Sequence, residues 1–124
     1  MGEPWRVEIE PEVRRWLELL SAAEYDKAER VVDMLLAMPT TLAEPYSRHL
    51  GGKLRELRFT MDGNATRITY WLAADRRIVL LTVFRKSRQR EAAEVERAQQ
   101  AQKVCQADHE PATHDYERIN GERP

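Results

Sequence analysis

Hydrophobic and polar residues near the N-terminus first alternate and then recur every three to four positions. Trp5, Val7 and Ile9 alternate with charged residues, which predicts a short strand with one buried face. Pro11 suits the first turn of a helix, because the amide that proline lacks would be unpaired there. The predicted helix has an apolar stripe made of Val13, Trp16, Leu17 and Leu20.

A second helix is predicted to begin directly after the first. Ser21 and Glu24 have the spacing of a capping box, in which each side chain bonds the other residue's backbone amide. Pro39 ends this helix near Met38, and residues 39–52, with two prolines, two glycines and no periodicity, are predicted to form a loop. Since almost no linker separates the helices, we expect a hairpin or bent pair with a shared apolar surface. The stripe of the second helix consists of Ala28, Val31, Val32, Leu35 and Leu36.

The middle of the chain has the pattern of a β-hairpin. In residues 54–59, Glu56 and Arg58 lie on one face of the predicted strand and apolar residues lie on the other. Residues 62–64, Asp-Gly-Asn, tolerate positive φ and predict a tight turn. The second strand, 66–72, has one apolar face and an opposite face that carries Arg67, Thr69 and Trp71.

After a turn around 74–76, the last third of the chain changes from a buried strand to a polar helix. The run IVLLTVF at 78–84 shows no alternation, which predicts a strand covered on both faces. Ser87 can cap a final helix over 89–103, whose apolar stripe is small: Ala92, Val95, Ala98 and Ala101.

These elements predict an α+β domain over residues 1–104. We expect a small antiparallel sheet with the N-terminal helical pair on one face, and a C-terminal helix. If the helices cover the apolar face, the opposite face carries Arg58, Arg67 and the residues at the end of the last strand. Residues 105–124 are polar and aperiodic, and we expect a disordered tail there.

Composition narrows the class of protein. Hydrophobic residues make up 42% of the chain and charged residues 33%, as in small globular domains. No apolar run approaches the roughly 20 residues of a membrane-spanning helix, and the acidic N-terminus does not have the pattern of a signal peptide. We therefore expect a cytoplasmic protein without membrane contact. The single cysteine, Cys105, has no His or Cys neighbours at ligand spacing, so we expect no metal and no cofactor.

Positive charge is concentrated in the middle of the chain. Residues 53–90 contain ten Lys or Arg and three Asp or Glu, a net charge of +7, although the whole chain has a net charge of −1. The segments on either side each have a net charge of −4. A basic centre between acidic ends indicates an anionic partner for the central strands.

The ordered motifs of this central region resemble the RelE/HigB toxin superfamily, specifically its phage-derived HigB-like branch. The motifs are LRELRF, the stretch Arg67-Ile68-Thr69-Tyr70 after the hairpin, RRIVLLTVFRKS and EAAEVERAQ, in the family's order and spacing. The resemblance implies a RelE-like fold and the toxin of a type II toxin–antitoxin system, a ribosome-dependent endoribonuclease that cuts messenger RNA. It further implies a cognate antitoxin as partner, with operator DNA bound only through that antitoxin.

The resemblance also assigns basic positions. The family's arginines fall on Arg58 and Arg67, and the basic pair that closes the last strand falls on Arg85 and Lys86. Two positions depart from the pattern. Thr82 stands where relatives often have a histidine, and the start of the last helix lacks the tyrosine or histidine of several active members. A conventional general base is therefore not visible.

Basic residues can support RNA cleavage by the RNA's own 2′-hydroxyl. The transition state carries extra negative charge, and the arginine fork holds two phosphate oxygens without losing its own charge. Electrostatic stabilisation of this kind is often the largest catalytic contribution. Our hypothesis assigns catalysis to Arg58, Arg67 and Lys86, and RNA binding to Lys53, Arg55, Arg85, Arg88, Trp71 and His49.

Each of these assignments has an alternative. Arginines on an open sheet face are often only solvated, and His49 fits an ordinary loop residue. Trp71 suits the core or an antitoxin interface as well as it suits base stacking. At the level of function, the alternatives are a ParE-like inhibitor that binds DNA gyrase without cleaving anything, and a degenerate member that has kept only antitoxin binding.

Overall fold

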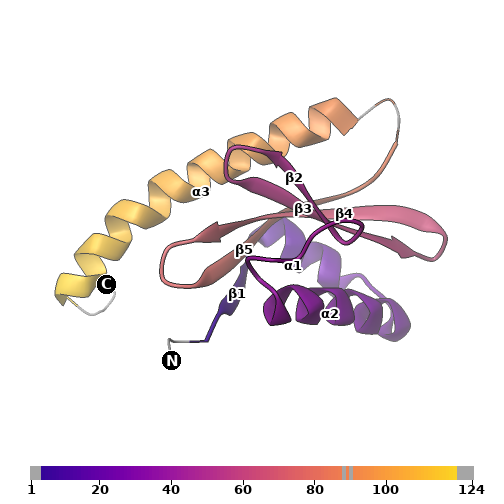
Figure 1. Ribbon diagram of the computed structural model, residues 1–124, viewed down its shortest axis with the longest axis horizontal. Helices are drawn as coiled ribbons and strands as arrows, with labels where there is room; N and C mark the ends of the chain where they lie inside the picture. Colours follow the sequence, from indigo (N-terminus) through magenta and orange to yellow (C-terminus); the bar gives the residue numbers. More distant parts are fainter. Residues whose placement is uncertain (1–3, 88, 90, 120–124) are drawn as a thin grey trace.

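The computed structural model describes residues 4–87, 89 and 91–119, with side chains as far as Asp108. Figure 1 shows the order of the elements along the chain. The strands and helices are β1 (Arg6–Ile9), α1 (Pro11–Glu18), α2 (Ala22–Ala37), β2 (Ser47–Gly51), β3 (Leu54–Met61), β4 (Asn64–Ala73), β5 (Arg77–Arg85) and α3 (Glu91–Ile119).

The strands form one mixed sheet in the order β1-β5-β4-β3-β2. The predicted α+β class and the helical pair are confirmed. Two features of the sheet differ from the prediction. β1 pairs with β5 in parallel, whereas the sheet was expected to be antiparallel throughout. Residues 47–51, expected in a loop, form the edge strand β2 against β3.

Local chemistry explains the helix starts and the first hairpin turn. Pro11 occupies the first turn of α1. At the start of α2, the Glu24 amide donates to Ser21 Oγ at 3.2 Å and the Ser21 amide donates to Glu24 Oε1 at 2.9 Å, so the predicted capping box is present. Between β3 and β4, Asp62 and Gly63 have φ of 51° and 78°, which is the geometry of a type I′ hairpin turn.

The α1–α2 pair covers one face of the sheet. Leu57, Ile68 and Tyr70 lie on that face, all at most 1% exposed. They pack against buried members of the helical stripe, which include Val13, Val31 and Leu35. Figure 1 shows these helices on the opposite side of the sheet from α3. This face contains the main hydrophobic core.

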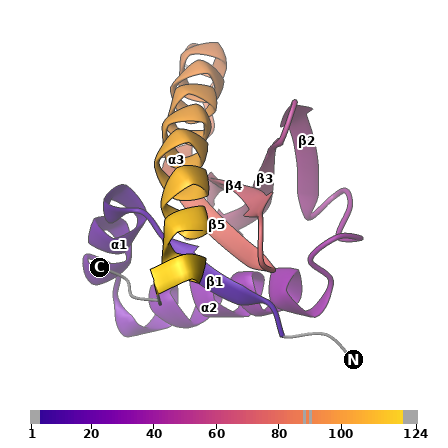
Figure 2. The same cartoon turned by 90° about the vertical axis from the view of Figure 1, so that its left-hand side faces the viewer.

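The other face, expected to be open, is covered in part by α3. Trp71, Leu81 and Leu54 form a second apolar cluster under Ala98 and Cys105 of this helix. Figures 1 and 2 show α3 passing alongside β5. Ala98 is completely buried, since its small side chain lets the helix approach the strands closely.

The C-terminal helix is longer than predicted. It was expected to end near Lys103, but it continues to Ile119. Cys105, which falls in the tail expected to be disordered, is 4% exposed. The packed part of the chain therefore extends past the predicted boundary at residue 104. Within the part of the chain that the structure describes, no helix is both long and apolar enough to cross a membrane.

A charged contact ties α3 to α1. Arg97 of α3 donates to both carboxylate oxygens of Glu12, and also to Glu94 one turn earlier. Burial alone would raise the pKa of Glu12, but the hydrogen bonds from Arg97 and from the Val83 amide lower it below its ordinary value. α1 and α3 lie on opposite faces of the sheet, and this contact joins them near the edge strand β1.

Replacing Ala98 by leucine tests the close packing of α3. The larger side chain has no room against the sheet, so we expect Ala98→Leu to lower the free energy of unfolding by about 1–3 kcal/mol. Ala93→Leu, the same change at an exposed position of the same helix, is the control and should shift stability by less than about 0.5 kcal/mol. Urea unfolding curves measure both. Equal stability of the two variants would contradict close packing of α3.

Candidate functional site

Two arginines and one glutamate meet on the face that α3 covers in part. Arg58 of β3 and Arg67 of β4 lie directly opposite each other across the strands. Glu56, two residues before Arg58, has a completely buried side chain. Its Oε2 lies 3.6 Å from Arg58 Nε and 3.7 Å from Arg67 Nε. One carboxylate thus neutralises part of the repulsion between two facing arginines.

The polar atoms of this cluster are under-satisfied. Among the described residues, both carboxylate oxygens of Glu56 and the Nε atoms of Arg58 and Arg67 are buried without a hydrogen-bond partner. Burial raises the pKa of Glu56, although both arginines oppose this effect. Burial also lowers the pKa of Arg67, and the neighbouring Arg58 adds to this shift. Unpaired charge at a buried position costs stability, and such positions are concentrated at functional sites.

A bulge in β5 sets which side chains join this face. Thr69 pairs with Thr82 and Tyr70 pairs with Leu80, so Leu81 is an extra residue opposite β4. The extra residue reverses the alternation of the strand beyond it. Phe84 consequently lies opposite Arg67, and the Lys86 amide donates to the carbonyl of Ala65, which continues the pairing. The bulge thereby places the exposed Lys86 on the same face as the arginines.

Neighbouring strands and α3 add two charged residues that were not predicted for the site. Arg48 of β2 lies opposite Glu56 and is exposed. Glu91, at the start of α3, interacts electrostatically with both Glu56 and Arg67. Arg48 was missed because its strand was predicted as a loop. Glu56 could have been found from its spacing, since it shares a strand face with Arg58.

Three residues predicted to bind RNA lie on the α1–α2 face instead. Arg55 donates to Ser47 Oγ at 3.1 Å and to the Tyr70 hydroxyl at 3.3 Å, so it is part of the internal packing. His49 lies opposite Arg55, and its Nε2 is 2.8 Å from the carbonyl oxygen of Gly52. These two side chains are therefore separated from the Arg58–Arg67 pair by the sheet.

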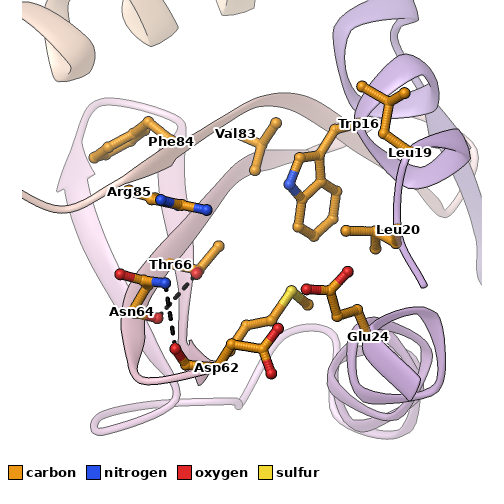
Figure 3. A pocket seen from close by; sticks show the side chains of 11 residues that line it. Trp16, Leu19, Leu20, Glu24, Asp62, Asn64, Thr66, Val83, Phe84 and Arg85 are labelled. Carbon is orange, nitrogen blue, oxygen red and sulfur yellow. Dashed lines mark hydrogen bonds between the residues drawn. The ribbon is translucent and has the colours of Figure 1, made fainter. Parts of the chain in front are cut away.

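Arg85, the third of them, lines a cavity of about 490 Å³ on the α1–α2 face. Figure 3 shows its guanidinium in the same cavity as Asp62, Glu24 and the apolar side chains at and just after the end of α1: Trp16, Leu19 and Leu20. The interaction between the carboxyls lowers the pKa of Glu24 and raises that of Asp62, and Arg85 interacts with both. The predicted basic pair at the end of β5 is thus divided between the two faces.

Trp71 and Lys53 lie away from the arginine pair, with Trp71 under α3 and Lys53 beside the Trp71 ring. Trp71 is 2% exposed, and its Nε1 donates to Cys105 Sγ at 3.4 Å. The Trp71 ring is covered by α3 in this structure and has almost no exposed surface on which a base could stack. Lys53 lies 5.8 Å above the Trp71 ring, beside α3. Arg88 lies outside the described residues.

Comparisons with known proteins place the chain in a family. The profile of the family described as "Phage derived protein Gp49-like (DUF891)" matches residues 15–103. The chain belongs to this family. A search among curated proteins found no match.

Solved structures share the fold at low sequence identity. The free Escherichia coli toxin RelE, with two arginines replaced by alanine, superposes with a TM-score of 0.57 at 13% identity over 82% of this chain and 98% of that one. The RelE–RelB complex from Pyrococcus horikoshii OT3 gives a TM-score of 0.50 at 22% identity over 69% of this chain and 99% of that one. The intact E. coli RelBE toxin–antitoxin complex gives a TM-score of 0.50 at 8% identity over 68% of this chain and 99% of that one. The predicted RelE-like fold is confirmed, and the matching family is a phage-derived one, as predicted.

Thiol labelling tests how firmly α3 closes over this face. Cys105 is the only cysteine of the chain, and burial raises the pKa of its thiol, so we expect slow reaction with a disulfide reagent in the native protein. Glu12→Gln weakens the contact with Arg97 and should speed labelling about two- to five-fold.

The control for this labelling is Glu18→Gln, an exposed position of the same helix α1, which should leave the rate unchanged. If Glu12→Gln also labels at the wild-type rate, the contact between Glu12 and Arg97 does not hold α3 in place.

Proposed function

We propose that this protein is the toxin of a type II toxin–antitoxin system and that it cleaves messenger RNA on the ribosome. The observation that carries the proposal is the facing pair Arg58 and Arg67, with the exposed Lys86 on the same side of the sheet. Membership of the Gp49-like family and the RelE-like fold support the class of protein. The reaction proposed is attack of the RNA's own 2′-hydroxyl on the neighbouring phosphorus, with departure of the 5′-oxygen.

The exposure of the three basic side chains suggests different roles. Lys86 is exposed and the Arg58 side chain is 22% exposed, so these two are assigned to contact with the scissile phosphate. Arg67 is 7% exposed and donates from Nη1 to the Thr66 carbonyl at 3.0 Å. We assign Arg67 to electrostatic stabilisation of the phosphate without direct contact. In a site with little water, its charge acts with less screening than a solvated charge would.

Electrostatics is the main catalytic effect in this proposal. The tyrosine and the histidine of the described strands, Tyr70 and His49, lie on the other side of the sheet. The hydroxyls of Thr69 and Thr82 are 2.6 Å apart, and both residues are buried. Threonine here cannot replace the histidine of relatives as a base near neutral pH, because its hydroxyl does not titrate there. Proton transfer is therefore assigned to water or to the ribosome.

The proposed partner is an antitoxin. Two of the structures that share this fold are complexes of RelE with RelB. We infer that a cognate antitoxin neutralises this protein in the cytoplasm. An acidic segment of the antitoxin would bind the basic face, which is the side of the sheet that carries Arg58, Arg67 and Lys86, and operator DNA would be bound only through the antitoxin. Complementary charge speeds such an association and gives it specificity.

Loss of either exposed cation tests the nuclease. In cells induced to make the protein, we expect new 5′ ends in messages, and Arg58→Ala or Lys86→Ala should reduce their frequency by a factor on the order of 10². Arg30→Ala removes the same charge from the exposed side of α2 and should cut as the wild type does. Growth arrest with intact messages and broken DNA would favour a gyrase inhibitor. Normal growth with a folded product would indicate a degenerate member.

Copurification tests the antitoxin. When the gene is expressed together with the small reading frame beside it, the two products should elute as one complex. Lys86→Glu reverses a charge on the basic face and should raise the dissociation constant, with the larger effect at low salt. Arg30→Glu is the control on the other side of the molecule. Elution of the wild-type protein alone would contradict this partner.

A further inference from the structure

Glu56 is the residue of the basic face that the proposed chemistry does not use. Its side chain is completely buried, and both carboxylate oxygens are inaccessible to solvent. It therefore cannot touch RNA in this structure, so a role as general base is excluded by geometry. Its contacts are with the Nε atoms of Arg58 and Arg67, at 3.6 and 3.7 Å.

The sequence positions the carboxylate between two like charges. Arg58 and Arg67 lie directly opposite each other on adjacent strands, an arrangement in which two cations repel. Glu56 precedes Arg58 by two residues and so lies on the same strand face. A carboxylate has two acceptor oxygens and no donor, and it can attract both guanidinium groups at once.

We propose that Glu56 is a positioning residue, whose buried charge holds Arg58 and Arg67 side by side in the arrangement that an RNA phosphate requires. This inference rests on the function proposed above. The contacts are made through Nε, which leaves the Nη end of Arg58 for the phosphate. Arg67 also donates from Nη1 to the Thr66 carbonyl. Each arginine side chain is therefore held at its Nε by the same carboxylate.

The unpaired atoms favour this role over one in stability. At 3.6 and 3.7 Å the contacts are ion pairs without a hydrogen bond, and the buried carboxylate and the two buried Nε atoms have no hydrogen-bond partner. A carboxylate that served the fold alone would be expected to have hydrogen-bond donors at shorter range. The Glu8–Arg77 pair on the same sheet has such a bond, at 3.3 Å, and Glu8 is 39% exposed.

Variants at position 56 separate charge from geometry. Glu56→Gln keeps the size but removes the negative charge and replaces one carboxylate oxygen by an amide nitrogen that only donates, so it attracts the two arginines less strongly. Glu56→Asp keeps the charge, but its side chain is one methylene shorter, so the carboxylate lies farther from the two arginines. We expect Gln to lower kcat for message cleavage in a translation extract by up to about 10²-fold with KM almost unchanged, and Asp to lower it less. Glu8→Gln is the control and should cleave as the wild type does.

The position of the arginines can be read without activity. In the wild type, the buried Nε–H groups of Arg58 and Arg67 should give resolved ¹H–¹⁵N signals that exchange slowly with water. In Glu56→Gln these signals should broaden or move, while the Arg77 signal stays. Thermal unfolding first establishes that each variant is folded at the assay temperature. If Glu56→Gln does not fold, Glu56→Asp carries the same comparison.

Titration reads the contact between Glu56 and the two arginines directly. The charged groups that face Glu56 are Arg58 on its own strand, Arg67 on β4, Arg48 on β2 and Glu91 on α3. Because burial raises its pKa, Glu56 gains a proton at a higher pH than an ordinary glutamate as the solution is acidified. The two Nε signals should shift together at that pH in the wild type, and the shift should be absent in Glu56→Gln.

The outcomes distinguish the two proposals. Full cleavage by folded Glu56→Gln, with unchanged kcat, would overturn the positioning role while leaving the nuclease intact. A wild-type protein that cuts no message would overturn the nuclease. In that case the Nε signals decide about Glu56: signals that are the same in the wild type and in Glu56→Gln overturn its role, and signals that depend on Glu56 support it.

Discussion

The sheet has two apolar faces, and each requires a cover before the central strands can exclude water. The α1–α2 pair supplies a broad cover rich in large side chains. α3 supplies a narrow one, in which Ala98 and Cys105 press against Trp71 and Leu81. A small-residue contact buries little area and depends on close approach. The basic cluster lies beyond the apolar part of this second cover, on the same face of the sheet.

This arrangement explains why the basic cluster is both buried and charged. Strand pairing sets Arg58 and Arg67 against each other, and α3 begins at Glu91, which interacts with both Arg67 and Glu56. Removing charge from water costs free energy, and the geometry of this triad returns only part of it. The cost is tolerated where a dry, preorganised field serves binding or catalysis, which is the condition that phosphate chemistry favours.

The elements with local signals were predictable, and those that depend on distant partners were not. Pro11 and the Ser21–Glu24 box act within one helical turn, and Asp62-Gly63 acts within one hairpin, so sequence alone revealed them. The parallel pairing of β1, the strand β2 and the bulge at Leu81 arise from contacts across the sheet. That bulge decides the side of the sheet on which Lys86 and Arg85 point. Arg58 and Arg67 lie on the regular hairpin β3–β4, so their shared face could be predicted from alternation alone. The residues predicted to bind RNA depended on β2 and on the bulge, and they are divided between the two faces.

The parallel pairing of β1 with β5 has a consequence for the order of folding. Arg6 aligns with Arg77, so the first strand has no partner until roughly 70 further residues have been synthesised, about 4–14 s at ordinary rates of translation. During that interval α1 and α2 also lack the sheet on which their stripes are buried. The nascent chain therefore exposes this apolar surface until the later strands have been synthesised. The arginine pair and Lys86 can be brought together only after β5 has left the ribosome, because β5 pairs with β4.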